Sequence, residues 1–121
     1  MSTRTELVAY LKTATPDYRV LPYFKDLDGP SSLTVMVQTE RVEKADTGVW
    51  TAFTSVLVVT GVKDPERAED TLDVALDRVL RALADYPPSI DADAERVLYG
   101  DALQAYRINL QIPYFIGEET N

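Results

Sequence analysis

Four carboxylates on one predicted helix form the densest group of side chains that could do chemistry in this sequence. They recur at helical spacing and are Glu66, Asp70, Asp73 and Asp77. Oxygen ligands of this kind bind hard cations such as magnesium and calcium, but the Asp-rich loop spacing of a calcium site is missing. A solvated helix face explains the same residues, with first-turn acids complementing the helix dipole and Asp77 pairing with Arg81 four residues on. We therefore predict a solvated acidic face and no metal site.

The other residue types that catalysis uses are missing or isolated. The chain has no histidine and no cysteine, which removes the commonest general base, thiolate nucleophiles and the commonest ligands of transition metals. Ser31, Ser32 and Ser55 have no activating partner in the sequence. The carboxylates are numerous enough for a hydrolase, but no spacing singles out an acid and a base, and no glycine-rich loop could cradle a phosphate. The sequence thus predicts no enzyme and no cofactor.

Charge and hydropathy narrow the class of partner. The chain has 20 acidic and 12 basic residues and a formal net charge of -8, which repels nucleic-acid phosphates and anionic lipids. No apolar stretch approaches the roughly 20 residues of a membrane-spanning helix. We expect a protein that stays in the cytoplasm or leaves it by a route other than secretion.

The elements that position these residues are organised around a strand and helix over residues 49–83. The strand is rich in β-branched and aromatic residues, and its apolar end, residues 56–59, indicates a central strand covered on both sides. Asp64 and Pro65 are typical of an N-cap and first helical position. The apolar residues that follow, from Ala68 to Leu83, recur at three-and-four spacing and predict one packed face. A pair of prolines then ends the helix.

The whole chain, residues 1–121, is predicted to be a single domain, because half this length holds too small a core to fold easily alone. The predicted elements are a helix over residues 5–14, an edge strand over 18–23, strands over 33–42 and 49–60, a helix over 65–86 and a strand over 106–116. Residues 26–32 are predicted to form a surface loop. Residues 87–95 show no clear periodicity of apolar residues, and residues 96–100 fit a short strand or a turn. This order predicts an α+β fold, a mainly antiparallel sheet of about four strands with two helices on one face.

Two features of this sheet predict contact with other subunits. The helices can cover only one face, yet Val56 and Val58 lie on one side of their strand and Leu57 and Val59 on the other. Burial against a neighbouring subunit would account for both sets. Residues 43–48 also suit a hairpin whose longer, charged tip projects from two long strands, and aromatic residues beside this tip could anchor a partner. The predicted interface residues are Glu43, Lys44, Asp46, Val49 and Trp50.

The pattern as a whole resembles the tail terminator (tail completion) proteins of long-tailed bacteriophages, particularly those of phages that infect actinobacteria. The similarity is one of pattern and element order over nearly the full length, with no signature motif. It is carried by residues 4–11, 18–23 (with the early Pro22), 33–37, 57–60, 64–70, 72–80 and 106–110.

The resemblance implies a small α+β subunit that assembles into a closed ring, usually a hexamer, on the last ring of the tail tube. Such a ring stops tube growth and offers a docking surface to the head connector. The implied partners are other copies of the chain, the tail tube protein and the head-tail connector protein. The implied location is the head-proximal end of the virion tail, and the host cytoplasm during assembly. DNA would contact the ring only in passage, and an acidic lumen wall built from the four helix carboxylates could keep it from sticking.

Two other classes of function remain open at this point. A head-tail connector or neck subunit has a similar ring role with a different neighbour. A cytoplasmic adaptor or immunity-type binding protein needs no ring. A stable monomer under all conditions favours the adaptor, whereas rings favour either phage role.

Overall fold

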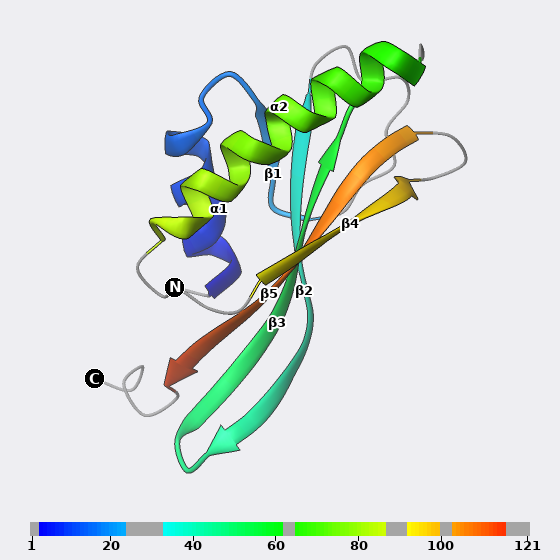
Figure 1. Ribbon diagram of the computed structural model, residues 1–121. Coiled ribbons are helices and arrows are strands. Elements are labelled where there is room, and N and C mark those ends of the chain that lie inside the picture. The colour runs from blue at the N-terminus through cyan, green and yellow to red at the C-terminus, as the bar shows by residue number, and fades with distance from the viewer. Residues whose placement is uncertain (1–2, 24–32, 62–64, 87–91, 100–102, 116–121) are drawn as a thin grey trace.

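Two helices and a five-stranded sheet make up the described part of the chain (Figure 1). The computed structural model describes residues 3–23, 33–61, 65–86, 92–99 and 103–115. The elements are, in chain order, α1 (Thr3–Ala14), β1 (Arg19–Leu21), β2 (Thr34–Asp46), β3 (Val49–Val59), α2 (Pro65–Ala84), β4 (Ala92–Tyr99) and β5 (Leu103–Phe115).

The strands are ordered β1-β2-β3-β5-β4 across the sheet. β1 runs parallel to β2, and the other three pairings are antiparallel. The predicted α+β class with a mainly antiparallel sheet is therefore confirmed. β1 is also the short edge strand that the sequence predicts, and it ends at Leu21, before the proline that cannot donate to a ladder.

The sheet has five strands where about four were predicted, and the additional one is β4. The sequence predicts no element over residues 87–95 and a short strand or a turn over 96–100, whereas β4 covers Ala92–Tyr99. Alanine, aspartate and glutamate have low intrinsic strand propensity. Pairing with β5, from Ala92 opposite Leu110 to Tyr99 opposite Leu103, imposes the extended conformation on them.

β2 and β3 form a hairpin as predicted, but the longer tip that was predicted over residues 43–48 is wrong. β2 continues to Asp46, which pairs with Val49, so that only Thr47 and Gly48 form the turn. Gly48 has a φ of 73°, in the left-handed region that glycine enters without strain. The charged residues that suggested a loop belong to an exposed strand.

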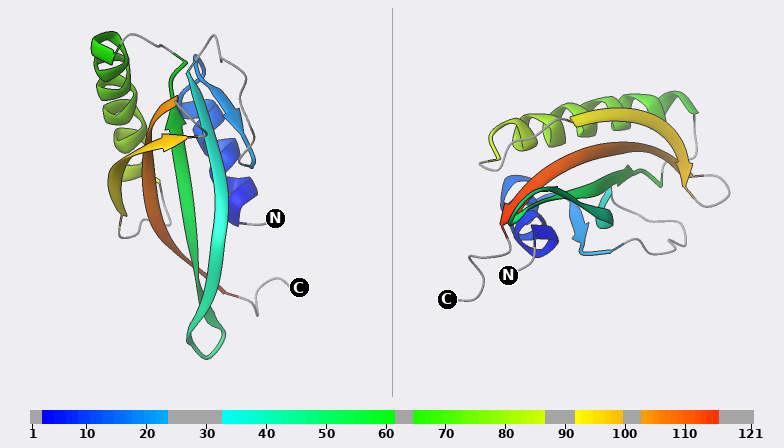
Figure 2. Two further views of the ribbon diagram at one scale, coloured as in Figure 1. Left: turned by 90° about the vertical axis from the view of Figure 1, so that its right-hand side faces the viewer. Right: turned by 90° about the horizontal axis from the view of Figure 1, so that it is seen from below.

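The main core lies between the two helices and one face of the sheet, as predicted. α1 and α2 each contribute a buried apolar stripe, and β2, β3 and β5 contribute alternate residues such as Val37, Val56 and Ile108. The two helices also contact each other, because the Tyr10 hydroxyl donates a 2.6 Å hydrogen bond to the carbonyl oxygen of Ala82. Figure 2 shows both helices behind the same face of the sheet.

The opposite face carries a second, smaller core. Met36, Leu57, Val59 and Ala105 are at most 2% exposed there, and Leu21, Val97 and Leu103 pack against them. The expectation that a neighbouring subunit must bury this apolar set is therefore wrong, because the chain itself covers it.

Some predicted features fall outside the described residues. These are the surface loop over residues 26–32, the N-cap Asp64 and the two prolines after α2. Pro113, predicted to lie at a sheet edge or strand end, is in β5 beyond the last β4 pair at Leu110, and among the described strands only β3 pairs with β5 at that point.

Two buried threonines predict opposite effects of one substitution. The Thr54 hydroxyl is buried without a hydrogen-bond partner among the described residues, whereas the Thr15 hydroxyl donates a 2.7 Å hydrogen bond to the Leu11 carbonyl oxygen. Thr54→Val should raise the free energy of unfolding by about 1 kcal/mol, and Thr15→Val should lower it by about 1 kcal/mol. Urea unfolding of the two variants measures both changes in the free energy of unfolding. If both variants were destabilised, the Thr54 hydroxyl would have a hydrogen-bond partner.

The stability of the fold should decrease at alkaline pH because of Tyr86. Burial raises the pKa of this phenol, and the Glu6 carboxylate and Tyr10 add to the effect. An unfolded tyrosine titrates near pH 10, so above about that pH the unfolded chain binds fewer protons and stability falls as the pH rises through the folded-state pKa. Tyr86→Phe should reduce the loss of unfolding free energy between about pH 9 and 11. If the free energy of unfolding changed with pH equally in the two proteins, Tyr86 would not be the cause of the alkaline loss of stability.

Candidate functional site

A row of polar side chains crosses the sheet on the face that the helices leave open. Strand register places Gln38 of β2 opposite Ser55 of β3, Ser55 opposite Asn109 of β5, and Asn109 opposite Asp93 of β4. Paired residues of neighbouring strands point to the same face. One residue from each of four strands thus lies in line beside the second core.

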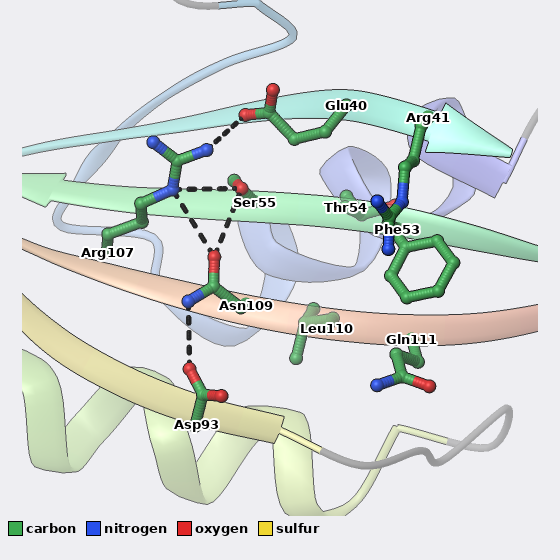
Figure 3. A pocket seen from close by; sticks show the side chains of 10 residues that line it. All are labelled: Glu40, Arg41, Phe53, Thr54, Ser55, Asp93, Arg107, Asn109, Leu110 and Gln111. Atoms are coloured by element: carbon green, nitrogen blue, oxygen red, sulfur yellow. Dashed lines mark hydrogen bonds and ion pairs between the residues drawn. The ribbon is translucent and has the colours of Figure 1, made fainter.

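Arg107 ties this row together (Figure 3). Its Nε donates to the Ser55 Oγ at 3.2 Å and to the Asn109 Oδ1 at 3.3 Å, and its Nη2 lies 2.6 Å from the Glu40 Oε1. The Ser55 hydroxyl donates to the Asn109 Oδ1 at 3.4 Å. The Asn109 amide nitrogen donates to the Asp93 carboxylate at 2.8 Å. The network spans β2, β3, β5 and β4 through side chains as well as through the backbone.

The network borders a shallow hollow of about 350 Å³. Arg41 closes one side of it, with its guanidinium carbon 4.2 Å from the centre of the Phe53 ring, a cation-π contact. Glu40 and Asp93 supply two negative charges and Arg41 and Arg107 two positive ones, so that the charges in the lining balance. The remaining lining residues are Thr54, Ser55, Asn109, Leu110 and Gln111.

A register shift in β2 explains how Glu40 reaches Arg107. Thr39 pairs with Thr54 and Arg41 pairs with Phe53, so Glu40 is an extra residue on β2. A β-bulge of this kind bends the strand and re-aims side chains. Both Glu40 and Arg107 side chains remain about one-third exposed, at 33% and 34%.

The side chains around the hollow offer hydrogen-bonding groups suited to binding polar groups, and among the described residues Ser55 has no adjacent base. The contacts of the Ser55 hydroxyl in the described residues are the Arg107 guanidinium and the Asn109 amide oxygen. Neither accepts a proton at neutral pH, and a serine nucleophile needs an adjacent base. The hollow instead presents hydrogen-bonding groups already held in place by one another.

The predicted interface residues come together at the far end of the β2–β3 hairpin. Lys44 pairs with Trp50 and Asp46 with Val49, and Glu43 is one position further along β2. Glu43 and Lys44 are exposed, and Val49 and Trp50 are half-buried. Glu43, Lys44 and Asp46 lie in a strand where a longer hairpin tip was predicted, whereas Val49 and Trp50 lie in a strand as predicted. Strand register places Lys44 and Trp50 on one face of the hairpin and Glu43 on the other, where Glu43 pairs at 3.7 Å with Arg41 of the hollow.

The four helix carboxylates form an exposed stripe on α2. Glu66, Asp70, Asp73 and Asp77 are all exposed, and Asp77 pairs with Arg81 at 2.8 Å as predicted. In the described part of the chain, no three acidic side chains are grouped as a metal site would require.

One further ion pair connects α2 to the edge of the sheet. Arg96 of β4 lies 2.7 Å from the Glu69 carboxylate, which lowers the pKa of Glu69 through their hydrogen bond. The same guanidinium donates a 2.7 Å hydrogen bond to the Gln104 side-chain oxygen. This ion pair shows that the side of β4 that carries Arg96 faces α2.

Sequence reasoning missed the polar row because it depends on strand register. The alternating pattern of their strand predicts Arg107, Asn109 and Gln111 on the solvent-facing side, which is a usable signal. The sequence does not predict which residues of the other strands lie beside them.

Neither described helix has the combination of length and apolar character needed to cross a bilayer. Comparison of the sequence with protein-family models finds no match, and comparison with curated proteins finds none either.

Proposed function

We propose that this protein is a tail terminator subunit of a long-tailed bacteriophage, which forms a hexameric ring on the end of the tail tube. In this role it stops tube polymerisation and presents a docking surface to the head connector. The observation that carries the proposal is the β2–β3 hairpin, which projects well beyond both helices (Figure 2). A projecting arm on a small α+β domain suits a subunit that reaches a neighbour.

The polar groups on the open face of the sheet also support a role in recognition, because hydrogen bonds between them already hold them in place. The virion tail and, during assembly, the host cytoplasm are the proposed locations.

Binding to tube ends tests this function directly. Purified tail tubes of the phage that encodes the protein should bind it in an amount proportional to the number of tube ends. Shearing the same mass of tube into shorter pieces should therefore increase the bound protein in proportion, while tubes that already carry a terminator should bind none. Binding that follows tube mass, or no binding, would contradict the proposal. A protein found instead on isolated connectors would be a neck subunit.

The acidic stripe of α2 is proposed to line the lumen of the ring. The exposed Glu66, Asp70, Asp73 and Asp77 would there repel DNA phosphates and keep the passing genome from sticking. Phage carrying Glu66→Gln, Asp70→Asn, Asp73→Asn and Asp77→Asn together should eject DNA more slowly and be less infective. Unchanged DNA passage and infectivity would remove the stripe from the lumen.

A further inference from the structure

The two guanidinium groups at the polar hollow are both paired with acids. Arg107 lies 2.6 Å from the Glu40 carboxylate, and Arg41 lies 3.7 Å from that of Glu43. Glu40 also accepts a 3.5 Å hydrogen bond from the side-chain nitrogen of Gln38, so that both of its carboxylate oxygens have partners. The positive charges of the hollow are therefore balanced by acids of β2.

Asp93 is the acid of the hollow that has no basic partner. In the part of the chain that the structure describes, it forms no ion pair. Glu95, two residues along β4 on the same face, is opposite Arg107 in the strand register, but the Arg107 guanidinium is directed to Glu40 and the polar row. Two exposed carboxylates on β4 are thus left unbalanced, in a chain with a net charge of -8. The β4 side of the hollow attracts a cation and repels an anion.

The Asp93 carboxylate is held in one orientation. Its Oδ1 accepts a 2.8 Å hydrogen bond from the Asn109 side-chain nitrogen, and the Asn109 oxygen in turn accepts hydrogen bonds from Arg107 and Ser55. These bonds fix which end of the Asn109 amide faces Asp93. The other carboxylate oxygen points away from Asn109 (Figure 3), and no described side chain donates to it. An acceptor that is already fixed loses little conformational freedom when a ligand binds.

One open carboxylate oxygen suits an ammonium group better than a guanidinium group. A guanidinium group pairs best through two parallel hydrogen bonds, one to each carboxylate oxygen, and Asn109 already donates to one oxygen of Asp93. An ammonium group is a compact charge that needs a single acceptor oxygen. Gln111 also lines the hollow, is exposed, and is a diagonal neighbour of Asp93 across the β4–β5 pair, where it supplies a further amide oxygen.

The size of the hollow suits one side chain better than a free ligand. Its volume of about 350 Å³ is near the lower limit for pockets that enclose small molecules, roughly 300–1,000 Å³. A single exposed ion pair contributes little binding free energy, so a free amine would have too few contacts to stay bound. A lysine side chain belongs to a protein that contacts the surrounding sheet as well, and its four methylene groups have the half-buried Phe53 to lie against.

We propose that the polar hollow binds the ammonium group of a lysine side chain from a partner protein that docks on the open face of the sheet, with the Asp93 carboxylate as its acceptor. The inference goes beyond the proposed function, because the chemistry of the hollow is the same for any protein that presents a lysine to this face.

Nuclear magnetic resonance titration with short peptides as probes tests the site. The blocked tripeptide acetyl-Gly-Lys-Gly-amide, added to the isotope-labelled full chain, should shift the side-chain amide signals of Asn109 along a saturating curve. The same peptide with norleucine in place of lysine keeps the methylene groups without the charge, and it should leave these signals unchanged. The peptide with arginine should need a higher concentration for half saturation, because the carboxylate offers one open oxygen.

Two variants with the same change of charge separate this site from the general acidity of the chain. Asp93→Asn keeps the shape of the side chain and an oxygen that accepts from Asn109. It should raise the half-saturating concentration of the lysine peptide about fivefold, the effect of losing one exposed ion pair. Asp73→Asn, at an exposed position on α2, is the matched control and should leave that concentration unchanged.

Three results would overturn the proposal. They are an equal response to the norleucine peptide, tighter binding of the arginine peptide, and no difference between Asp93→Asn and Asp73→Asn. Butylamine, which lacks the peptide groups, should bind more weakly than the lysine peptide, and equal affinity would assign the hollow to a free amine instead of a docked protein. The peptide comparisons use the unsubstituted protein, so they decide the matter even where a variant fails to fold. Because no tail tube is present, these results are independent of the tube-end experiment.

Discussion

Leu72→Ala should lower the free energy of unfolding by about 2–5 kcal/mol, the range for removing a fully buried leucine side chain. Leu72 is 0% exposed and belongs to the core that joins α2 to the sheet. A single domain has only about 5–15 kcal/mol of stability in total, so the loss should be visible as a large fall in the urea midpoint. The cost includes lost apolar contact and the cavity that the rigid sheet cannot fill.

Val74→Ala is the matched control for this prediction. It removes methyl groups from the same helix two residues away, where the side chain is 67% exposed. Alanine is the better helix former, so the change should alter stability by no more than about 0.5 kcal/mol. Comparable losses for the two variants would mean that α2 does not pack on the sheet through its Leu72 side.

The parts of the fold that were predicted are those whose periodicity is set by a single buried face. α2 places Leu72 and Val79 at helical spacing toward the core, and β5 places Ile108, Leu110 and Ile112 on alternate positions toward it. In both, the apolar pattern alone specifies the element and its orientation. The two-sided burial predicted for the end of β3 is also present, because Val56 and Val58 lie in one core and Leu57 and Val59 in the other.

The elements that the sequence does not predict are those whose conformation depends on an adjacent strand. β4 has little apolar periodicity of its own, and it is extended because β5 lies beside it. The end of β2 is charged and exposed on its outer side, yet its pairing with β3 continues to Asp46. Local propensity describes a strand poorly where the stabilising contacts are to another strand.

The polar hollow was beyond sequence reasoning for a related physical reason. Its residues come from four strands. Glu40 and Arg107 are far apart in the sequence, and the registers of β2, β3 and β5 bring them together. The position of Glu40 depends in addition on a one-residue bulge, and a slip of one residue moves a side chain to the other face. From the sequence alone, Ser55 is only a possible nucleophile without a base, because its neighbours Arg107 and Asn109 depend on the alignment of the strands.

The removal of Arg107 should have the second large effect on stability. Arg107→Met keeps the aliphatic length but leaves the Glu40 carboxylate, the Ser55 hydroxyl and the Asn109 amide oxygen without their shared donor. Ser55 is 1% exposed, so water replaces little of what it loses. We expect the free energy of unfolding to fall by about 1–2 kcal/mol, because hydrogen bonds to charged groups are stronger than neutral ones but this pair is about one-third exposed.

Comparison with a surface pair separates network formation from charge alone. Arg81→Met removes a guanidinium of the same type, paired with Asp77 at 2.8 Å, but that side chain is 81% exposed. Its loss should cost less than about 0.5 kcal/mol. In a Glu40→Gln background, Arg107→Met should also cost less than in the unsubstituted protein, because no unpaired carboxylate is left behind. If the two substitutions had additive effects on the free energy of unfolding, Glu40 and Arg107 would not be energetically coupled. The hollow would then lack the fixed polar lining that suits it to binding.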